Sequence, residues 1–498
     1  MFSLNRIKYR HIQCASAVPT LLCDFYKVSH RAQYPEGSEV IYSTFTPRSN
    51  KQYPQVKRVV SFGFQAFIIK YLINYFNLNF FSRPRNEVVT EYTAFIKRTL
   101  NMTNSGEHIG ELHDLGYLPL RIKAIPEGKS VAVHVPVMTI ENTHPAFFWL
   151  TNYVETLINV SLWLPMTSAS VARMYYLTLQ RFARETCDDM NHIPFQAHDF
   201  SMRGMSSLES VETSGAAHLI AFLGTDTIPA ISFVEQYYGS RQLIGTSIPA
   251  SEHSVMSAHG VDELPTFRYL MNKFPDSMLS IVADTTDFWH NISVNLPLLK
   301  DEIMRRPPHA RVVIRPDSGD AMDILCGRAQ AQTRHERQGL IECLWQIFGG
   351  TVNDKGYKVL DPHIGVIYGD GVHYEKMLNI LNGLKAKGFA ANNIVFGVGS
   401  RTYQSNTRDT LGFAVKATSI RINGVEKGIF KNPKTDDGLK KSQCGRVKVT
   451  GLDCYVDGLT AADDFSDDLL QPIFENGKLL NVTSFDQIRA NFFAEVNA

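Results

Sequence analysis

The sequence predicts an α/β protein built around parallel strands, and two observations carry this prediction. Four apolar runs end in Asp, Gly or Ser: "LSIVADTTD" (279–287), "RVVIRPDSGD" (311–320), "IGVIYGDG" (364–371) and "NIVFGVGS" (393–400). Most are followed by a helix-like stretch such as "EKMLNILNGLKAKG". Repeated strand, turn and helix units are typical of an α/β barrel or a doubly wound sheet. In either fold the strand carboxyl ends share one face, where we expect the functional site.

The two ends of the chain have a different character. Residues 1–150 mix short strand-like runs such as "EVIYSTF" with helical stretches, and the C-terminal residues return to short strands and turns. We predict that 1–150 together with 411–498 form a mixed α+β domain and that 151–410 form the α/β-barrel domain. In the latter, "FFWLTNYVETLINVSLWL" and "VARMYYLTLQRFARET" have helical spacing, with a break expected at Pro165.

Composition excludes several classes of protein. Fifty Lys plus Arg against forty-nine Asp plus Glu leave a formal charge of +1, which favours neither nucleic acid nor an anionic membrane as a partner. The most apolar long stretch, near residues 66–81, is interrupted by Lys70 and several Asn, so no membrane span is expected. The cysteines form no C-x-x-C pair, which predicts free thiols, no structural zinc and a cytoplasmic location. They are Cys14, Cys23, Cys187, Cys326, Cys343, Cys444 and Cys454.

The turns after the predicted strands offer ligand-binding groups. Arg315 is a planar fork of donors suited to phosphate or an aromatic ring. Asp284, Asp317 and Asp370 could arrange Mg²⁺ and its waters, and "DSG", "GDG" and "GVGS" could hold phosphates through backbone N–H groups. One such turn is weak support because Gly-Asp pairs are common turn formers. Several at successive strand ends favour a site.

Two further segments hold candidate residues, each with an ordinary structural alternative. His253 follows Glu252 in "SIPASEHSVM", although a lone histidine is more often structural than catalytic. "HDFSMRGMSS" (198–207) brings Phe200 and Arg203 close, and together they could clamp a flat ring. The alternative is ordinary packing of Phe200 with Arg203 in a surface ion pair. P-loop, dinucleotide-binding, zincin and serine-hydrolase motifs are absent from the sequence.

Taken in order, these segments resemble those of the nicotinamide phosphoribosyltransferase family. The resemblance rests on "CDFYKVSHRAQYP", "HDFSMRGMSS", "FLGTDT", "SIPASEHS", "IRPDSGD", "IYGDGV" and "FGVGS…NTRD", and it runs from about Asp24 to "SFDQIRAN". It implies a homodimeric type II phosphoribosyltransferase with an incomplete α/β barrel and a second mixed α+β domain. Such an enzyme joins nicotinamide to 5-phosphoribosyl-1-diphosphate in NAD salvage, giving nicotinamide mononucleotide and diphosphate with Mg²⁺.

The resemblance also implies a pyridine-binding slot. Phe200 would stack on one face of the ring and the partner subunit's Tyr26 on the other, with Asp226 accepting a hydrogen bond from the carboxamide N–H₂. Because a carboxylate attracts an amide donor and repels a nicotinate carboxylate, Asp226 argues for nicotinamide over nicotinic acid. The other residues that the resemblance assigns to this part of the site are Asp24, Arg203, Ser247, Ser280 and Arg315.

The remaining implied roles concern phosphate groups. ATP would be the phosphoryl donor to His253, with Glu252 and Asp284 as supports, and Asp317 would bind ribose hydroxyls or the metal shell. Mg²⁺ would be held mainly by diphosphate and water, without a set of protein ligands. The residues implied at the 5′-phosphate are Gly369, Asp370, Gly399 and Ser400, and those implied at the phosphate and diphosphate groups, some across the dimer, are Arg48, Arg408, Lys416 and Lys431.

Two departures and several alternatives remain. Where the family often has consecutive glycines, this chain reads Val398, Gly399, Ser400 and Arg401, and His373 is a further variation without an assigned role. The enzymatic alternative is a nicotinate or quinolinate phosphoribosyltransferase. The alternative from another class is a non-catalytic homologue acting as a binding or signalling protein. A generic barrel enzyme such as an aldolase is disfavoured by the lack of a convincing Schiff-base lysine on a strand.

Overall fold

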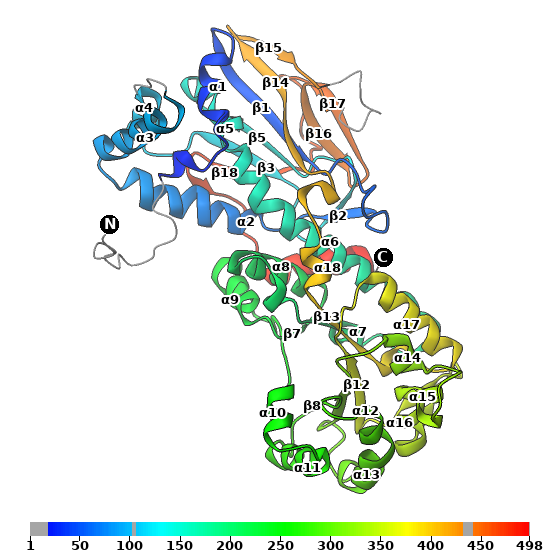
Figure 1. Ribbon diagram of the computed structural model, residues 1–498. Helices are drawn as coiled ribbons and strands as arrows, with labels where there is room; N and C mark the ends of the chain where they lie inside the picture. The colour runs from blue at the N-terminus through cyan, green and yellow to red at the C-terminus, as the bar shows by residue number, and fades with distance from the viewer. Residues whose placement is uncertain (1–17, 102–105, 432–441, 498) are drawn as a thin grey trace, which may run out of the picture.

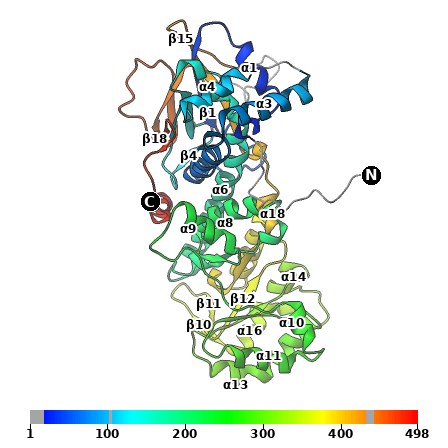
Figure 2. The same cartoon turned by 90° about the vertical axis from the view of Figure 1, so that its left-hand side faces the viewer.

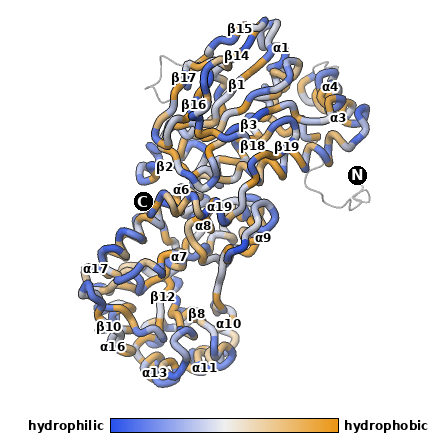
Figure 3. Tube along the Cα trace, turned by 180° about the vertical axis from the view of Figure 1, so that it is seen from behind, coloured by the Kyte–Doolittle hydropathy of each residue, from blue (hydrophilic) through white to orange (hydrophobic). Residues whose placement is uncertain are grey.

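The computed structural model describes residues 18–101, 106–431 and 442–497. The chain forms two halves stacked end to end, an antiparallel sheet with its helices above and a curled parallel sheet with its helices below (Figures 1 and 2). Helix α6 (Glu155–Thr186) runs from the upper half into the lower one. Seen from behind, apolar and polar stretches alternate along the helices that cover the lower half (Figure 3), as expected where only one face of a helix is buried.

The upper half is built on a seven-stranded antiparallel sheet with the order β15-β14-β1-β5-β3-β18-β19. The strands are β1 (Ser38–Thr46), β3 (Leu120–Ala124), β5 (Met138–Asn142), β14 (Ala414–Ile422), β15 (Val425–Gly428), β18 (Gln471–Glu475) and β19 (Lys478–Leu479). Helices α1 (Lys27–Gln33), α3 (Arg85–Leu100) and α4 (Glu107–Leu115) lie beside it (Figure 1). Strands from both ends of the sequence therefore belong to one sheet.

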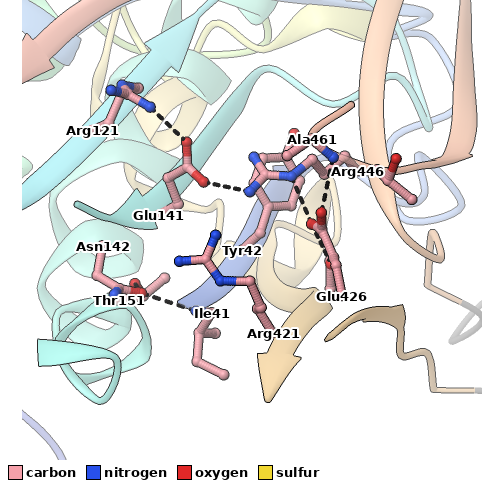
Figure 4. A network of polar contacts seen from close by, with 12 residues as sticks. Ile41, Tyr42, Arg121, Glu141, Asn142, Thr151, Arg421, Glu426, Arg446 and Ala461 are labelled. Atoms are coloured by element: carbon pink, nitrogen blue, oxygen red, sulfur yellow. Dashed lines mark hydrogen bonds and ion pairs between the residues drawn. The ribbon is translucent and has the colours of Figure 1, made fainter. Parts of the chain in front are cut away.

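A chain of ion pairs crosses this sheet and joins its early strands to its late ones (Figure 4). Arg446, in β16 (Arg446–Gly451), pairs with Glu141 of β5 at 2.8 Å and with Glu426 of β15 at 2.7 Å. Arg121 of β3 pairs with the same Glu141 at 3.2 Å and with Glu475 of β18 at 2.6 Å. Because Arg446 and Glu141 are largely buried, losing one partner would leave the other charge poorly solvated.

The lower half is built on a six-stranded parallel sheet with the order β7-β6-β13-β12-β9-β8. The strands are β6 (Ala197–Asp199), β7 (Gly224–Thr225), β8 (Leu279–Val282), β9 (Val312–Arg315), β12 (Ile364–Tyr368) and β13 (Val395–Val398). The four strands predicted from sequence are β8, β9, β12 and β13, and the predicted fold class, an incomplete α/β barrel with a mixed α+β domain, is confirmed. Strands β6 and β7 were not predicted.

An extended segment links the two edges of the parallel sheet. It runs between α9 (Ile228–Tyr237) and α10 (His253–Ala258), where Figure 1 shows it as a long descending stretch. The Thr246 N–H donates to the carbonyl of Leu223 at 2.8 Å, and the Thr246 carbonyl accepts from Thr225 at 3.0 Å. Further along, the Ser251 N–H donates to the Ser280 carbonyl at 2.9 Å, and the Ser280 N–H donates to the Pro249 carbonyl at 2.9 Å. The sheet therefore curls around a shared interior.

Pro165 lies inside the continuous 32-residue helix α6, so the predicted break there was wrong. A proline removes one helical hydrogen bond and crowds the preceding turn, but burial can offset that cost. Pro165 is buried, and a Cβ on Gly63 would lie 3.0 Å from its Cγ, so the glycine leaves room for the ring. Tertiary packing therefore keeps the helix continuous through the proline.

Helices cover the outside of the parallel sheet. They include α8 (Leu208–Ala221), α11 (Glu263–Lys273), α13 (Leu296–Met304), α14 (Ala321–Cys326), α16 (Leu340–Phe348) and α17 (Tyr374–Ala386). The C-terminal helix α19 (Phe485–Val496) lies where the two halves meet (Figure 1). Its Arg489 donates to the carbonyls of Leu219 and Ile244 at 2.5–2.9 Å, and burial lowers the pKa of Arg489 to about 10 against the opposing charge of Asp486. The domain boundaries at residues 150 and 411 stay a prediction.

Two expectations from composition can be compared with the described residues. No helix among them is both long and apolar enough to cross a membrane. The six cysteines in the described ranges are free thiols, and Cys14 lies outside those ranges.

Candidate active site

The ends of the parallel strands meet at one edge, which we call the barrel mouth, and a cavity of about 430 Å³ lies inside the curled sheet. Its lining includes His198, Phe200, Asp226, Ser247, Ser280 and Arg315. Buried polar atoms without a hydrogen-bond partner in the described chain gather here, among them Ser280 Oγ, Asp284 Oδ1 and Arg315 Nε. Since buried polar groups are normally paired, these atoms mark a place for a polar ligand.

Phe200 is held in this cavity by two glycines. It follows β6, and its backbone N–H donates to the carbonyl of Val398 in β13 at 2.9 Å. A Cβ on Gly397 would lie 2.4 Å from Phe200 Cδ2, and one on Gly369 would lie 3.1 Å from it. The absence of side chains at Gly397 and Gly369 therefore sets where the Phe200 ring lies.

Asp226, which follows β7, is an oriented and ionised carboxylate. His198 Nε2 lies 2.8 Å from Asp226 Oδ1, and Ser247 Oγ donates to the same oxygen at 2.5 Å. Burial alone would raise the pKa of Asp226, but the bonds from His198 and Ser247 and the charge of Arg315 bring it below its usual value. Oδ2 is therefore left to accept from a ligand. His198 was not predicted as a site residue, although it lies two residues before Phe200 in the "HDF" segment.

Arg315 and two aspartates occupy the next strand ends. Arg315 Nη2 donates to the Ser251 carbonyl at 2.8 Å, which fixes the guanidinium plane while Nε stays unpaired. Asp284 Oδ2 accepts from the Asp317 N–H at 2.9 Å and from Ser318 Oγ at 2.6 Å. The turn after β9 is thus tied to the turn after β8, and the Asp317 carboxylate remains partly exposed.

His253 opens α10 close to this turn and is half exposed. Its Nδ1 lies 3.0 Å from Thr285 Oγ1, and its Nε2 lies 3.8 Å from Asp317 Oδ2. The hydrogen bonds of the expected supports go elsewhere, because Glu252 accepts from Ser254 Oγ and Asp284 binds the turn after β9. Thr285 was not among the candidates, and only its place in "ADTTD" could have suggested it.

The two glycine-containing turns expected to hold phosphate lie side by side. Thr402, in α18 (Ser400–Gln404), donates to the Val372 carbonyl at 3.1 Å, which joins the turn after β13 to the turn after β12. Gly399 has no atom within 4 Å of where a Cβ would lie. Asp370 is exposed, and its carbonyl accepts from Lys376 Nζ at 3.0 Å.

The two departures from the family pattern, Arg401 and His373, are neighbours at these turns. The pKa of His373 is lowered by its partial burial and by the positive charge of Arg401. Arg203 is exposed in the neighbouring turn Met202–Gly204, where a Cβ on Gly204 would lie 2.1 Å from Ser400 Oγ. Arg401, Arg203 and Lys376 therefore add positive charge around the partly exposed backbone of Gly399.

A second group of candidate residues lies in the upper half, near the start of α6. Asp24 accepts from Thr156 Oγ1 at 2.8 Å, and Lys416 Nζ lies 3.9 Å from Glu155. Burial lowers the pKa of Lys416, and the charges of Arg48 and Lys431 lower it further against the opposing effect of Glu155. The Tyr26 side chain is 56% exposed. Arg408 pairs with Asp409 at 2.9 Å, and Arg48 Nε donates to the Gly412 carbonyl at 2.9 Å. We call Asp24, Tyr26, Arg48, Arg408, Lys416 and Lys431 the cationic group.

Within one chain the cationic group and the barrel mouth are separate. Tyr175, twenty residues after Glu155 on α6, lies 3.1 Å from Thr402 in the helix that begins at Ser400. Twenty residues of helix rise about 30 Å. Figure 1 likewise shows α1, which follows Tyr26, high in the upper half and α10, which opens with His253, low in the other. The structure therefore does not bring Tyr26 to Phe200 in a single chain.

Among the described residues no three His, Cys, Asp or Glu side chains come close enough together to hold a metal ion. Asp284 and Asp317 lie at the mouth, where Asp284 Oδ2 accepts from the turn after β9 and Asp284 Oδ1 has no partner among the described residues.

Comparisons with known proteins agree with this geometry. The sequence profile of the nicotinate phosphoribosyltransferase (NAPRTase) family matches residues 195–478, and that of the nicotinamide phosphoribosyltransferase N-terminal domain matches residues 19–122. The fold resembles a nicotinate-nucleotide pyrophosphorylase from Pyrococcus furiosus (TM-score 0.55, 14% identity, covering 99% of this chain and 98% of that one). It also resembles human nicotinic acid phosphoribosyltransferase (TM-score 0.52, 15% identity, covering 95% and 93%). Fold and site thus define a pyridine phosphoribosyltransferase class.

Relatives in sequence narrow the class. The chain is 44% identical to the nicotinamide phosphoribosyltransferase of Acinetobacter baylyi, covering 95% of this chain and 96% of that protein. It is 37% identical to the protein of the same name from Mycoplasma pneumoniae, covering 86% and 94%. The chain belongs to the nicotinamide phosphoribosyltransferase family and is an enzyme of the pentosyltransferase type.

The contact between Gly397 and Phe200 gives a stability prediction. Gly397→Ala should lower the free energy of unfolding by about 1–3 kcal/mol, because the new methyl group overlaps the ring. Gly399→Ala, two residues later, should change it by less than about 0.5 kcal/mol, since that position is open. Denaturant unfolding of the two variants measures the difference, and equal losses would show that the packing around Phe200 is not restrictive.

Proposed function

We propose that the protein joins nicotinamide to 5-phosphoribosyl-1-diphosphate, giving nicotinamide mononucleotide and diphosphate in NAD salvage. The observation that carries the proposal is the oriented Asp226 carboxylate beside Phe200 in the barrel cavity. A pyridine ring stacks on Phe200, and the carboxamide N–H₂ donates to Asp226 Oδ2. The names of the relatives support the same substrate.

Electrostatics at Asp226 supports the amide over the acid. Its pKa lies below the usual value, so the carboxylate stays charged at neutral pH. Both Oδ1 partners, His198 and Ser247, hold the group in place and leave Oδ2 for the ligand. A nicotinate carboxylate would meet a like charge in a partly dry cavity, which is costly.

The rest of the reaction needs placement and charge. The pyridine nitrogen uses its lone pair to form the bond to C1′ of the ribose, and the C1′–O bond breaks with its electrons leaving on diphosphate. No general base is needed, because that nitrogen carries no proton. Asp317 binds ribose hydroxyls, the partly exposed turns at Gly369 and Gly399 receive the 5′-phosphate, and Arg401 adds positive charge beside them. Mg²⁺, held mainly by diphosphate and water, would supply positive charge for the leaving diphosphate.

We further propose a homodimer with shared sites. The cationic group of one chain, about 30 Å from its own barrel mouth, supplies the partner's mouth with Tyr26 and with charges for diphosphate. The exposure of Tyr26 and the gathering of Arg48, Lys416 and Lys431, whose positive charges lower the pKa of Lys416, support this arrangement, because neighbouring positive charges suit a polyanionic ligand.

ATP is proposed as a phosphoryl donor to His253. A ring nitrogen of His253 attacks the γ-phosphorus, and ADP leaves with the electrons of the broken bond. The half-exposed ring supports this role, since Thr285 lies beside Nδ1 while Nε2 lies toward Asp317 at the mouth. A phosphoryl group at Nε2 would add negative charge next to Asp317, where it could attract Mg²⁺ and the diphosphate that Mg²⁺ binds.

Asp226→Asn tests the substrate assignment. Mononucleotide formation is measured with nicotinamide and nicotinic acid in parallel, with 5-phosphoribosyl-1-diphosphate and Mg²⁺. The wild type should use nicotinamide, and the variant should shift the ratio of the two kcat/KM values toward the acid by at least about tenfold, because the like-charge repulsion is removed. Asp370→Asn, on the phosphate side, should change both values alike. A wild type that uses only nicotinic acid would overturn the assignment.

His253→Ala tests the role of ATP. The variant should keep basal mononucleotide synthesis and lose the increase on adding ATP, because the phosphoryl acceptor is gone. His259→Ala, at the other end of the same helix and also exposed, should retain the increase. Undiminished stimulation in His253→Ala would remove this histidine from the ATP-dependent step.

A further inference from the structure

A second cavity lies outside the barrel, between the loop that precedes β2 (Arg58–Val60) and the middle of α6. Its volume is about 220 Å³, and it shares no lining residue with the barrel cavity. Among the described residues its lining contains four cationic side chains and no carboxylate. The cations are Lys57, Arg58, Arg173 and Arg181, and we call this place the α6 cavity.

Arg173 is the unusual member of this set. Its Nε is buried and has no hydrogen-bond partner in the described chain. Burial lowers the pKa of Arg173, with Glu495 opposing the shift and Arg58 adding to it. A buried donor of a charged group costs free energy unless something accepts from it. Arg173 is partly buried, and its Nε therefore lacks the acceptor that a buried guanidinium nitrogen normally has.

The nearby carboxylates are engaged elsewhere. Glu495 accepts from the Ser130 N–H at 3.1 Å and from Ser130 Oγ, and Asp453 accepts from Arg58 Nη1. Arg58 is further held by Nε donating to Ser130 Oγ at 3.0 Å and Nη2 donating to the Ser130 carbonyl at 2.7 Å. The Arg58 guanidinium is thus fixed beside Arg173, and the hydrogen bonds of Glu495 and Asp453 go to Ser130 and Arg58.

The outer cations are better solvated. Lys57 and Arg181 are exposed, and the Arg181 guanidinium lies 4.9 Å from the Phe182 ring centroid. Guanidinium groups form paired hydrogen bonds with tetrahedral oxyanions, and an ammonium adds a mobile point charge. Since the volume is below the roughly 300 Å³ at which drug-sized pockets begin, a small anion fits better than a nucleotide.

We propose that the α6 cavity binds a phosphate-class oxyanion, inorganic phosphate or diphosphate, with Arg173 as the inner ligand and Lys57 and Arg181 at the rim. The site is separate from the barrel mouth and does not depend on the proposed reaction. The two sites share no lining residue but are neighbours at α17. Tyr374 lines the α6 cavity and begins α17 three residues after Gly371, and Gln55 donates to Glu375 in the same turn at 3.2 Å. A bound anion would therefore contact the first turn of the helix that follows the phosphate turn.

The test is calorimetric titration of the full-length protein with inorganic phosphate and, in a second arm, with diphosphate, both without Mg²⁺ and at constant ionic strength set by chloride. The wild type should show a binding component that weakens at least about tenfold in Arg173→Gln and in Lys57→Gln/Arg181→Gln. The double variant changes only exposed side chains, so it decides the matter if Arg173→Gln does not fold. Binding in one arm only would identify which oxyanion the cavity takes.

Two controls test whether the binding component belongs to the α6 cavity. Arg98→Gln removes an exposed arginine that also lies over a phenylalanine, Phe95, and should leave the component unchanged. Arg401→Gln removes a charge beside the proposed 5′-phosphate turns of the barrel mouth and should also leave the component unchanged. No binding in either arm, or a component lost in Arg401→Gln and kept in both cavity variants, would overturn the proposal.

Discussion

The length and rigidity of α6 set the geometry on which the rest of the site depends. Its first residue, Glu155, pairs with Lys27 and lies near Lys416 in the cationic group. Its middle contacts the barrel mouth, where Tyr175 meets Thr402 and Thr178 meets Tyr374. Because the helix continues through Pro165, these two regions cannot approach each other within one chain. The proposed dimer would bring the cationic group of one chain to the barrel mouth of the other.

At the barrel mouth, backbone packing and side-chain chemistry depend on each other. Gly397 and Gly369 leave room for the Phe200 ring. The extended segment between α9 and α10, which contains Thr246, brings Ser247 to Asp226. The carboxylate is thereby oriented before any ligand binds. Preorganised groups of this kind cost little at the moment of binding, which is why a single carboxylate can decide between an amide and an acid.

The sequence was most informative where strands end in polar turns. The four longer parallel strands and the candidates Arg315 and Asp317 were predicted because apolar runs followed by Gly and Asp are local signals. Phe200 was a candidate because it lies close to Arg203 in its segment, and Asp226 was implied by the family resemblance alone. Strands β6 and β7, of three and two residues, were missed because they are too short to show a period. The break expected at Pro165 was wrong because a tertiary contact with Gly63 decides it.

Contacts between distant segments could not be predicted from local patterns. His198 and Thr285 join the site through partners 28 and 32 residues away, and only the fold makes those pairs. The unpaired Nε of Arg173 likewise could not be predicted from helical spacing, since its neighbours come from the loop before β2 and from α19. Sequence patterns name the reactive residue types, and packing decides which of them meet.

The sharing of each site between two chains is tested most directly by mixing two defective subunits. Tyr26→Ala and Phe200→Ala, each expected to be nearly inactive alone, are co-expressed with different affinity tags, and the mixed dimers are isolated through both tags. In a shared-site dimer, one site of each mixed dimer carries both defects and the other carries neither, so the mixed dimers should recover about half of the wild-type rate. Mixed dimers as inactive as either variant alone would contradict the account.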